Sequence, residues 1–97
     1  MDPKLKTELW TSWASMLRVY SAAHGLTSAQ QAVVEVGAQE IVLRVNTRWA
    51  RFSCDEMTTS EGMSVPFAML EDGSIQIGDV TDEMDMAAEE VARGMLH

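Results

Sequence analysis

The segment AVVEVGAQEIVLRVNTRWARFSC, residues 32–54, decides the fold that this sequence predicts. Apolar and polar side chains alternate along it, and β-branched and aromatic residues are frequent, which is typical of half-buried strands. We predict strands at 32–36, 41–45 and 48–54. The connections between them are too short for parallel crossovers, so the strands should form an antiparallel sheet.

The first connection determines how the first two strands pair. A four-residue loop at 37–40 sets Val36 opposite Ile41. A two-residue turn would instead set Glu35 opposite Glu40, and like charges in that position repel each other. The four-residue loop is therefore the prediction.

The second connection, Asn46-Thr47, can form a tight turn because asparagine tolerates a positive φ. This turn pairs Val45 with Arg48 and thereby assigns the side chains of both strands to two faces. The apolar face carries Ile41, Leu43, Val45, Ala50, Phe52 and Cys54. The opposite face carries Val42, Arg44, Trp49 and Arg51.

Two amphipathic helices are predicted, one before and one after the strands. The first spans 3–24, with Asp2 as its cap, and is followed by a polar connector at 27–30. The second spans 82–96, with Thr81 as its cap and several acidic residues in its first turn, where the helix dipole favours negative charge. The apolar stripes consist of Leu5, Leu9, Trp13, Met16, Leu17 and Tyr20 in the first helix, and of Met84, Ala88, Val91 and Met95 in the second.

A hairpin is predicted between the meander and the second helix. The dipeptide Asp72-Gly73 is a strong signal for a two-residue turn, and such a turn sets Leu70 opposite Ile75. Its two strands are expected at 65–70 and 75–77. Proline has no amide hydrogen to donate, so Pro66 predicts that its strand lies at an edge of the sheet or begins late.

Together these elements predict a single α+β domain over residues 1–97. It has an N-terminal amphipathic helix, an antiparallel sheet of about five strands (a three-stranded meander plus a hairpin) and a C-terminal acidic amphipathic helix. Residues 55–64, rich in Thr, Ser, Glu and Gly, are expected to form an exposed acidic loop. A chain of 97 residues is long enough for one modest core.

The charge is distributed unequally along the chain. Residues 56–97 carry ten acidic side chains and one basic one, whereas residues 1–55 carry five acidic and six basic ones, for a net charge of −8. This predicts one strongly anionic end, excludes direct nucleic-acid and anionic-membrane binding, and favours a partner with a basic surface. No apolar run is long enough to span a bilayer or to act as a signal peptide, and Cys54 is the single cysteine, so the expected compartment is the cytoplasm.

No pattern for catalysis, metal ligation or cofactor binding is found in the sequence, and we predict a protein that is not an enzyme. The histidines are His24, expected at the end of the first helix, and His97; neither is accompanied by a nucleophile motif. There is no Cys-x-x-Cys pair, no His pair at i,i+4 and no calcium loop. Asp82, Asp85 and Glu89 share one helix face, but a solvated acidic face explains that spacing better than a cation site.

The candidate partner-binding residues fall into two groups. Arg44, Trp49 and Arg51 share one face of the predicted sheet, and Arg and Trp are enriched at binding hot spots. Glu83, Asp85 and Glu90 belong to the acidic second helix. Eight methionines add adaptable apolar contacts. In the predicted hairpin Phe67 and Met69 point away from the apolar side, so the first helix, a protein partner or a second copy in a homodimer should cover them.

The predicted layout and the acidic charge resemble the small acidic secretion chaperones, dimeric α+β proteins that bind an extended client segment. The resemblance covers topology and charge; residues 55–64 are too short for the middle helix of that class, and no residue role is transferred. Four functions remain open. The first is a protein-interaction module whose affinity weakens with salt and with charge reversal at Glu83, Asp85 and Glu90. The others are an inhibitor that mimics nucleic acid in a basic groove, a secretion-chaperone-like client binder, and a small-ligand binder or enzyme with a pocket between the sheet and the helices.

Overall fold

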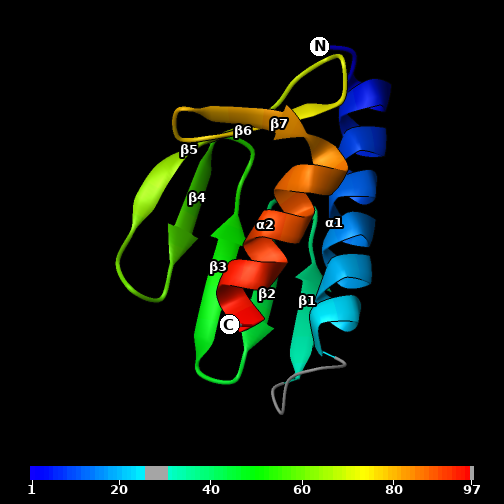
Figure 1. Cartoon of the computed structure of the whole chain (residues 1–97). Coiled ribbons are helices and arrows are strands. Elements are labelled where there is room, and N and C mark those ends of the chain that lie inside the picture. The colour runs from blue at the N-terminus through cyan, green and yellow to red at the C-terminus, as the bar shows by residue number, and fades with distance from the viewer. Residues whose placement is uncertain (26–30, 97) are drawn as a thin grey trace.

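Antiparallel strands joined in chain order form one sheet, and a helix precedes and follows it (Figure 1). The computed structural model describes residues 1–25 and 31–96, so the predicted connector at 27–30 and His97 lie outside the described residues. The elements are α1 (Pro3–Gly25), β1 (Ala32–Val36), β2 (Ile41–Val45), β3 (Arg48–Phe52), β4 (Glu56–Thr59), β5 (Ser64–Met69), β6 (Ser74–Ile77), β7 (Val80–Glu83) and α2 (Met84–Leu96). The α+β class is confirmed, but over these residues the sheet has seven strands rather than about five.

The meander has the predicted register. Val36 lies opposite Ile41, Val45 lies opposite Arg48, and the turn residue Asn46 has a φ of 57°. The third strand is shorter than predicted and ends at Phe52, so Cys54 lies beyond it and is exposed rather than buried on the apolar face.

One additional strand, β4, occupies part of the predicted acidic loop at 55–64. It pairs with β3, with Phe52 opposite Met57 and Arg51 opposite Thr58. Ser53 closes the connection, because its amide donates to the carbonyl of Glu56 at 2.8 Å. Only one of the four residues of β4 is a large apolar side chain, so alternation gave no signal for it.

The other additional strand, β7, occupies the predicted start of the second helix. Gly78, with a φ of 62°, and Asp79 form the turn that sets Ile77 opposite Val80. Thr81 is therefore a strand residue rather than a helix cap, and α2 begins at Met84 instead of residue 82. The acidic residues that were assigned to the first turn of a helix are divided between β7 and α2.

The β5–β6 hairpin has a different register from the predicted one. The amide of Leu70 donates to the carbonyl of Ser74 at 2.9 Å, which leaves a three-residue loop that ends at Gly73, where φ is 90°. Asp72 Oδ1 accepts the amide of Ser74 at 2.9 Å, and this hydrogen bond lowers the pKa of Asp72. A shift of one residue exchanges the two faces of a strand. As a result Phe67 and Met69 point into the core, and of the three predicted covers the first helix is the one observed, because its Trp13 packs against Phe67.

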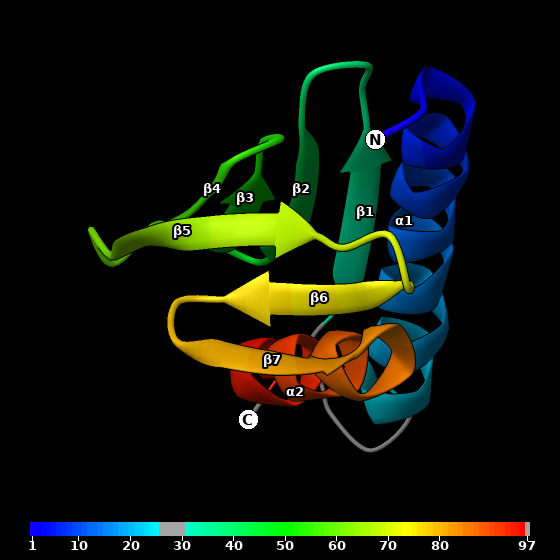
Figure 2. The same cartoon turned by 90° about the horizontal axis from the view of Figure 1, so that it is seen from above.

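Strand β5 is an interior strand, which corrects the edge position predicted from Pro66. Its first half pairs with β4 and its second half with β6, and Pro66 lies where the partner changes. The amide of Gly78 donates to the carbonyl of Pro66 at 2.8 Å, and the carbonyl of Gly78 accepts Nε2 of Gln76 at 3.3 Å. Pro66 has no amide hydrogen to donate to the carbonyl of Gly78. The side chain of Gln76 donates to that carbonyl instead, so the proline is tolerated inside the sheet. Figure 2 shows that β5, β6 and β7 run across the direction of β1, so the sheet is strongly curled.

Both helices pack on the inner face of the curled sheet. At the centre Trp13 of α1 meets Phe52 and Phe67, with ring centroids 5.3 Å and 5.7 Å from that of Trp13. All three side chains are buried, and those of α2 complete the same cluster. Asp2 caps α1 as predicted, since its Oδ1 accepts the amide of Lys4 at 2.9 Å.

Candidate protein-binding surfaces

The outer face of β2 and β3, which the helices do not cover, brings Arg44, Trp49 and Arg51 together. Arg44 lies opposite Trp49 in the register, as predicted, and the guanidinium carbon of Arg51 lies 4.9 Å from the centre of the Trp49 ring. This distance allows a cation–π contact, so Arg51 holds the indole against the sheet. Arg44, Trp49, Arg51 and Val42 are among the residues that line a hollow of about 360 Å³, which we call the arginine hollow.

Two glutamates that the sequence analysis did not select neutralise the arginine hollow. Arg44 Nε donates to Glu35 Oε1 at 3.0 Å, and Arg51 Nε lies 3.6 Å from Glu40 Oε2. Glu35 is the diagonal neighbour of Arg44 in the β1–β2 ladder, so the predicted register contained the signal for that pair. Glu40 belongs to a loop, whose geometry the sequence does not specify. The surface is therefore of mixed charge rather than basic.

A second surface follows the outer side of α2. One hollow, of about 230 Å³, lies between α2, β3 and the β4–β5 hairpin, and contains Met57, Met63 and Met95. A neighbouring hollow of about 240 Å³ lies between α2 and the β6–β7 hairpin. Glu90 and Val91 line both, so we treat the two hollows as one α2 groove. The side chains of the second hollow are Ile75, Ile77, Val80, Asp82 and Ala87.

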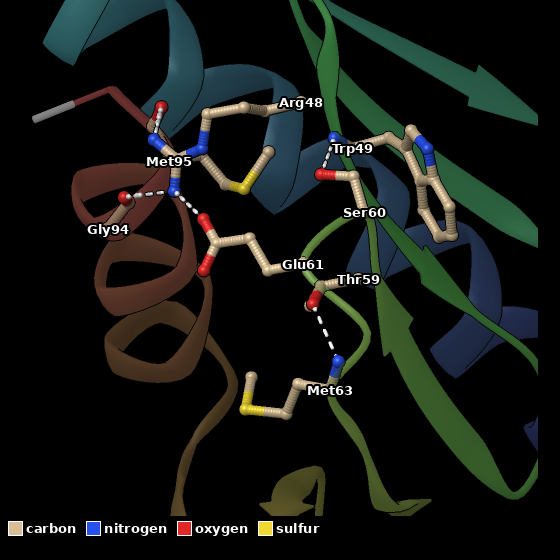
Figure 3. Close-up of polar contacts among 8 residues, drawn as sticks. All are labelled: Arg48, Trp49, Thr59, Ser60, Glu61, Met63, Gly94 and Met95. Carbon is tan, nitrogen blue, oxygen red and sulfur yellow. Dashed lines mark hydrogen bonds and ion pairs between the residues drawn. The ribbon is translucent and has the colours of Figure 1, made fainter.

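Arg48 fixes one end of the α2 groove (Figure 3). Its Nη1 and Nη2 donate to the carbonyls of Met95 and Gly94 at 3.2 Å and 3.4 Å, and Nη2 lies 3.2 Å from Glu61 Oε1. The last carbonyls of a helix have no partner within it, so a cation there is favourable. Glu61 belongs to the β4–β5 hairpin, and Arg48 therefore joins that hairpin to the end of α2. Nothing in the sequence pattern around Arg48 indicates this role.

The hairpin is also held to β3 and closed on itself by hydroxyl groups. Ser60 Oγ accepts the amide of Trp49 at 3.1 Å, and Thr59 Oγ1 accepts the amide of Met63 at 3.3 Å (Figure 3). In the figure the ring of Trp49 points away from the Arg48 guanidinium. These contacts position Met63 at the mouth of the groove, with 51% of its surface exposed.

The acidic residues that were predicted to bind a partner occupy different places. Glu83 ends β7, and Asp85 lies in the first turn of α2, where its Oδ1 accepts the amide of Met86 at 2.9 Å. Glu90 lines the α2 groove and pairs with Arg93 at 2.8 Å. The arginine residues of the other group lie on the opposite side of the sheet. Trp49 and Glu90 both line the hollow that contains Met57, Met63 and Met95, and there the two groups meet.

The acidic residues of the second half do not form one anionic end. Glu71 pairs with the amino group of Met1 at 3.8 Å, near the start of α1. Glu61 pairs with Arg48 beside the end of α2, at the opposite end of the molecule in Figure 1. The expectation of one strongly anionic end was wrong, because the hairpins carry these residues to opposite ends.

Within residues 1–25 and 31–96, no cluster of three or more potential metal ligands is found. None of the helices in the described part of the chain has the length and apolar character needed to cross a bilayer. Comparison of the chain with protein-family models, with curated proteins and with solved structures gives no match. A function can therefore be inferred only from the arginine hollow and the α2 groove.

Proposed function

We propose that this chain is a small, acidic, non-enzymatic protein-interaction module of the cytoplasm, which binds a basic or mixed-charge protein partner. The α2 groove is the observation that carries the proposal. Methionines and branched aliphatic side chains line it, and Met63 and Val80 at its edges are 51% and 60% exposed. Exposed apolar surface with a charged rim is typical of protein-binding sites, and methionine adapts to irregular partners.

The arginine hollow supplies a second contact area for the same partner. Tryptophan and arginine are the residue types that most often dominate binding energy at interfaces. Arg51 already holds Trp49 in place, so little side-chain entropy is lost when a partner packs on the ring. Trp49 lines both the arginine hollow and the α2 groove, and a partner that reaches around β3 can contact both.

Two other functions receive less support. A nucleic-acid mimic needs carboxylates that are free to face a basic groove, whereas Glu35, Glu40, Glu61, Glu71 and Glu90 are in ion pairs within the described structure. A secretion-chaperone-like client binder would need its middle helix between β3 and β5, where this chain has β4. A general interaction module needs neither rows of unpaired carboxylates nor a middle helix.

Affinity capture from the source cell tests the proposal. Bait proteins are the wild type, a variant with Glu83→Lys and Glu90→Lys, and a control with Glu8→Lys and Glu56→Lys. Both double variants change the net charge equally, and all four residues are exposed. Asp85 is left unchanged because its carboxylate accepts a backbone amide in the first turn of α2, where the helix dipole favours negative charge.

We expect a defined partner that the wild type and the control retain in about 50 mM salt. The Glu83/Glu90 variant should lose it, and about 500 mM salt should weaken all binding, because salt screens exposed charges. A partner set that is identical for all three baits, or the absence of any reproducible partner, would contradict the proposal.

A further inference from the structure

The shape of the α2 groove restricts what can occupy it. Its two hollows follow one another along α2: Ala87 lines one, Gly94 and Met95 line the other, and Val91 lies between them. At about 1.5 Å of rise per residue, the distance along the axis from Ala87 to Gly94 is about 10 Å. Two apolar side chains that project from one side of a partner helix, at i and i+4 or at i and i+7, are about 6 Å or 10 Å apart.

The charge of the groove restricts its occupant further. Of the side chains that line the two hollows, Glu61, Asp82 and Glu90 are acidic, and Arg48 is basic. Both nitrogens at the tip of Arg48 already contact the carbonyls of α2, and one of them also contacts Glu61. The carboxylate of Glu61 neutralises the charge of Arg48, so the carboxylates at the rim favour a cationic ligand.

We infer that the α2 groove binds a basic amphipathic helix of the partner protein. Two apolar side chains of that helix enter the two hollows, and its Lys or Arg residues lie against Asp82 and Glu90. This inference rests on the proposed function and adds the chemical class of the segment that is recognised. Docking of a helix requires only side-chain contacts with α2 and the two hairpins, so the sheet keeps its hydrogen bonds.

Model peptides test the inference with the full chain. The probe is a fluorescein-labelled Leu/Lys peptide with a helical apolar period, and the comparison peptide has the same composition in an order without that period. Fluorescence anisotropy gives the affinities, and the methyl resonances of the methionines locate the bound peptide. We expect the helical peptide to bind at least tenfold more tightly and to shift Met57, Met63 and Met95 but not Met1 or Met16.

Three variants separate the groove from general electrostatic attraction. Gly94→Leu projects a side chain into one hollow, and because a Cβ at this helical position meets no heavy atom within 4 Å, the protein should remain folded. We expect this variant to bind the helical peptide at least tenfold more weakly, with no loss of its own thermal stability. Glu90→Lys should weaken binding at least fivefold, and Glu8→Lys, on the exposed side of α1, should change it less than twofold.

Equal binding of the two peptides, shifts confined to other methionines, or full affinity of Gly94→Leu would overturn the inference. So would tighter binding of an extended peptide that pairs with the edge of β7. If the peptides fail but capture of a cellular partner still depends on Glu83 and Glu90, the proposed function stands and the helical occupant is wrong. If the helical peptide binds in the groove but no cellular partner is captured, the proposed function fails while the inferred preference stands.

Discussion

Replacement of Arg48 by alanine tests how the α2 groove is held together. The guanidinium contacts two carbonyls at the end of α2 and the carboxylate of Glu61 in the β4–β5 hairpin. Arg48→Ala removes all three contacts and leaves the last carbonyls of the helix dependent on water. The variant should therefore destabilise the fold and release the hairpin from α2.

The expected decrease in the free energy of unfolding depends on how exposed the groups that Arg48 contacts are. Hydrogen bonds to a charged donor contribute about 1.5–3 kcal/mol when they are protected, and 41% of the Arg48 side chain is exposed, so we take the lower end. A cation at a helix C-terminus contributes about 0.3–1 kcal/mol. The ion pair with Glu61, whose side chain is 69% exposed, adds at most about 0.5 kcal/mol. We expect a total loss of about 2 kcal/mol, or about 8–16 °C in Tm for a domain of this size.

Urea unfolding of four variants resolves these contributions. Arg44→Ala is the matched control, because its ion pair with Glu35 is exposed and should cost less than about 0.5 kcal/mol. Arg48→Lys keeps the charge but cannot donate to both carbonyls with the planar guanidinium geometry. Its decrease in the free energy of unfolding should therefore be about half that of Arg48→Ala. Glu61→Gln should cost no more than about 0.5 kcal/mol. If Arg48→Ala costs no more than Arg44→Ala, or if Glu61→Gln costs as much as Arg48→Ala, helix capping by Arg48 is refuted.

Three further predictions concern other parts of the fold. Gly94→Ala should raise the free energy of unfolding by about 0.5–1 kcal/mol in urea titrations, since glycine is a poor helix former and the added Cβ has open space. Phe67→Ala should lower it by about 3–5 kcal/mol, whereas a hairpin in the two-residue register would leave Phe67 exposed and make the change almost neutral. Because the folded pKa of Asp72 lies below the unfolded one, the stabilisation is complete above the unfolded pKa and is lost as the pH falls through the folded pKa. Carboxyl NMR titration should give a lower Asp72 pKa in the native chain than in urea, and Asp72→Asn should lose less stability in acid than the wild type does.

The register of β1, β2 and β3 could be predicted because two independent constraints agree. Repulsion between Glu35 and Glu40 excluded the short turn, and the alternation of both strands on either side of Asn46 gave the same buried face. That register also placed Arg44, Trp49 and Arg51 on one surface. A sheet face is a local consequence of pairing, so residues that share it can be found without the tertiary structure.

The β5–β6 hairpin shows why the rest could not be predicted. Asp72-Gly73 is compatible with a two-residue turn and with a three-residue loop in which Gly73 has a positive φ. The choice depends on which side of β5 is buried. The core has room for the large side chains of Phe67 and Met69, whereas the two-residue register would bury Ala68 in their place. Burial against distant elements is a tertiary property, and the strand alone has apolar residues on both sides.

The incorrectly predicted segments are the ones that build the α2 groove. Strand β4 supplies Met57, β7 supplies Val80 and Asp82, and the change of partner at Pro66 turns β6 and β7 across the first strands (Figure 2). Because β5 pairs with β4 before Pro66 and with β6 after it, the β4–β5 and β6–β7 hairpins run in different directions (Figure 2), and both border α2. A short strand, an interior proline and an ambiguous turn each weaken the local sequence signal. Together they allow the curl that brings the methionines and carboxylates of both hairpins to the groove along α2, so the proposed binding surface and the errors in prediction have the same physical origin.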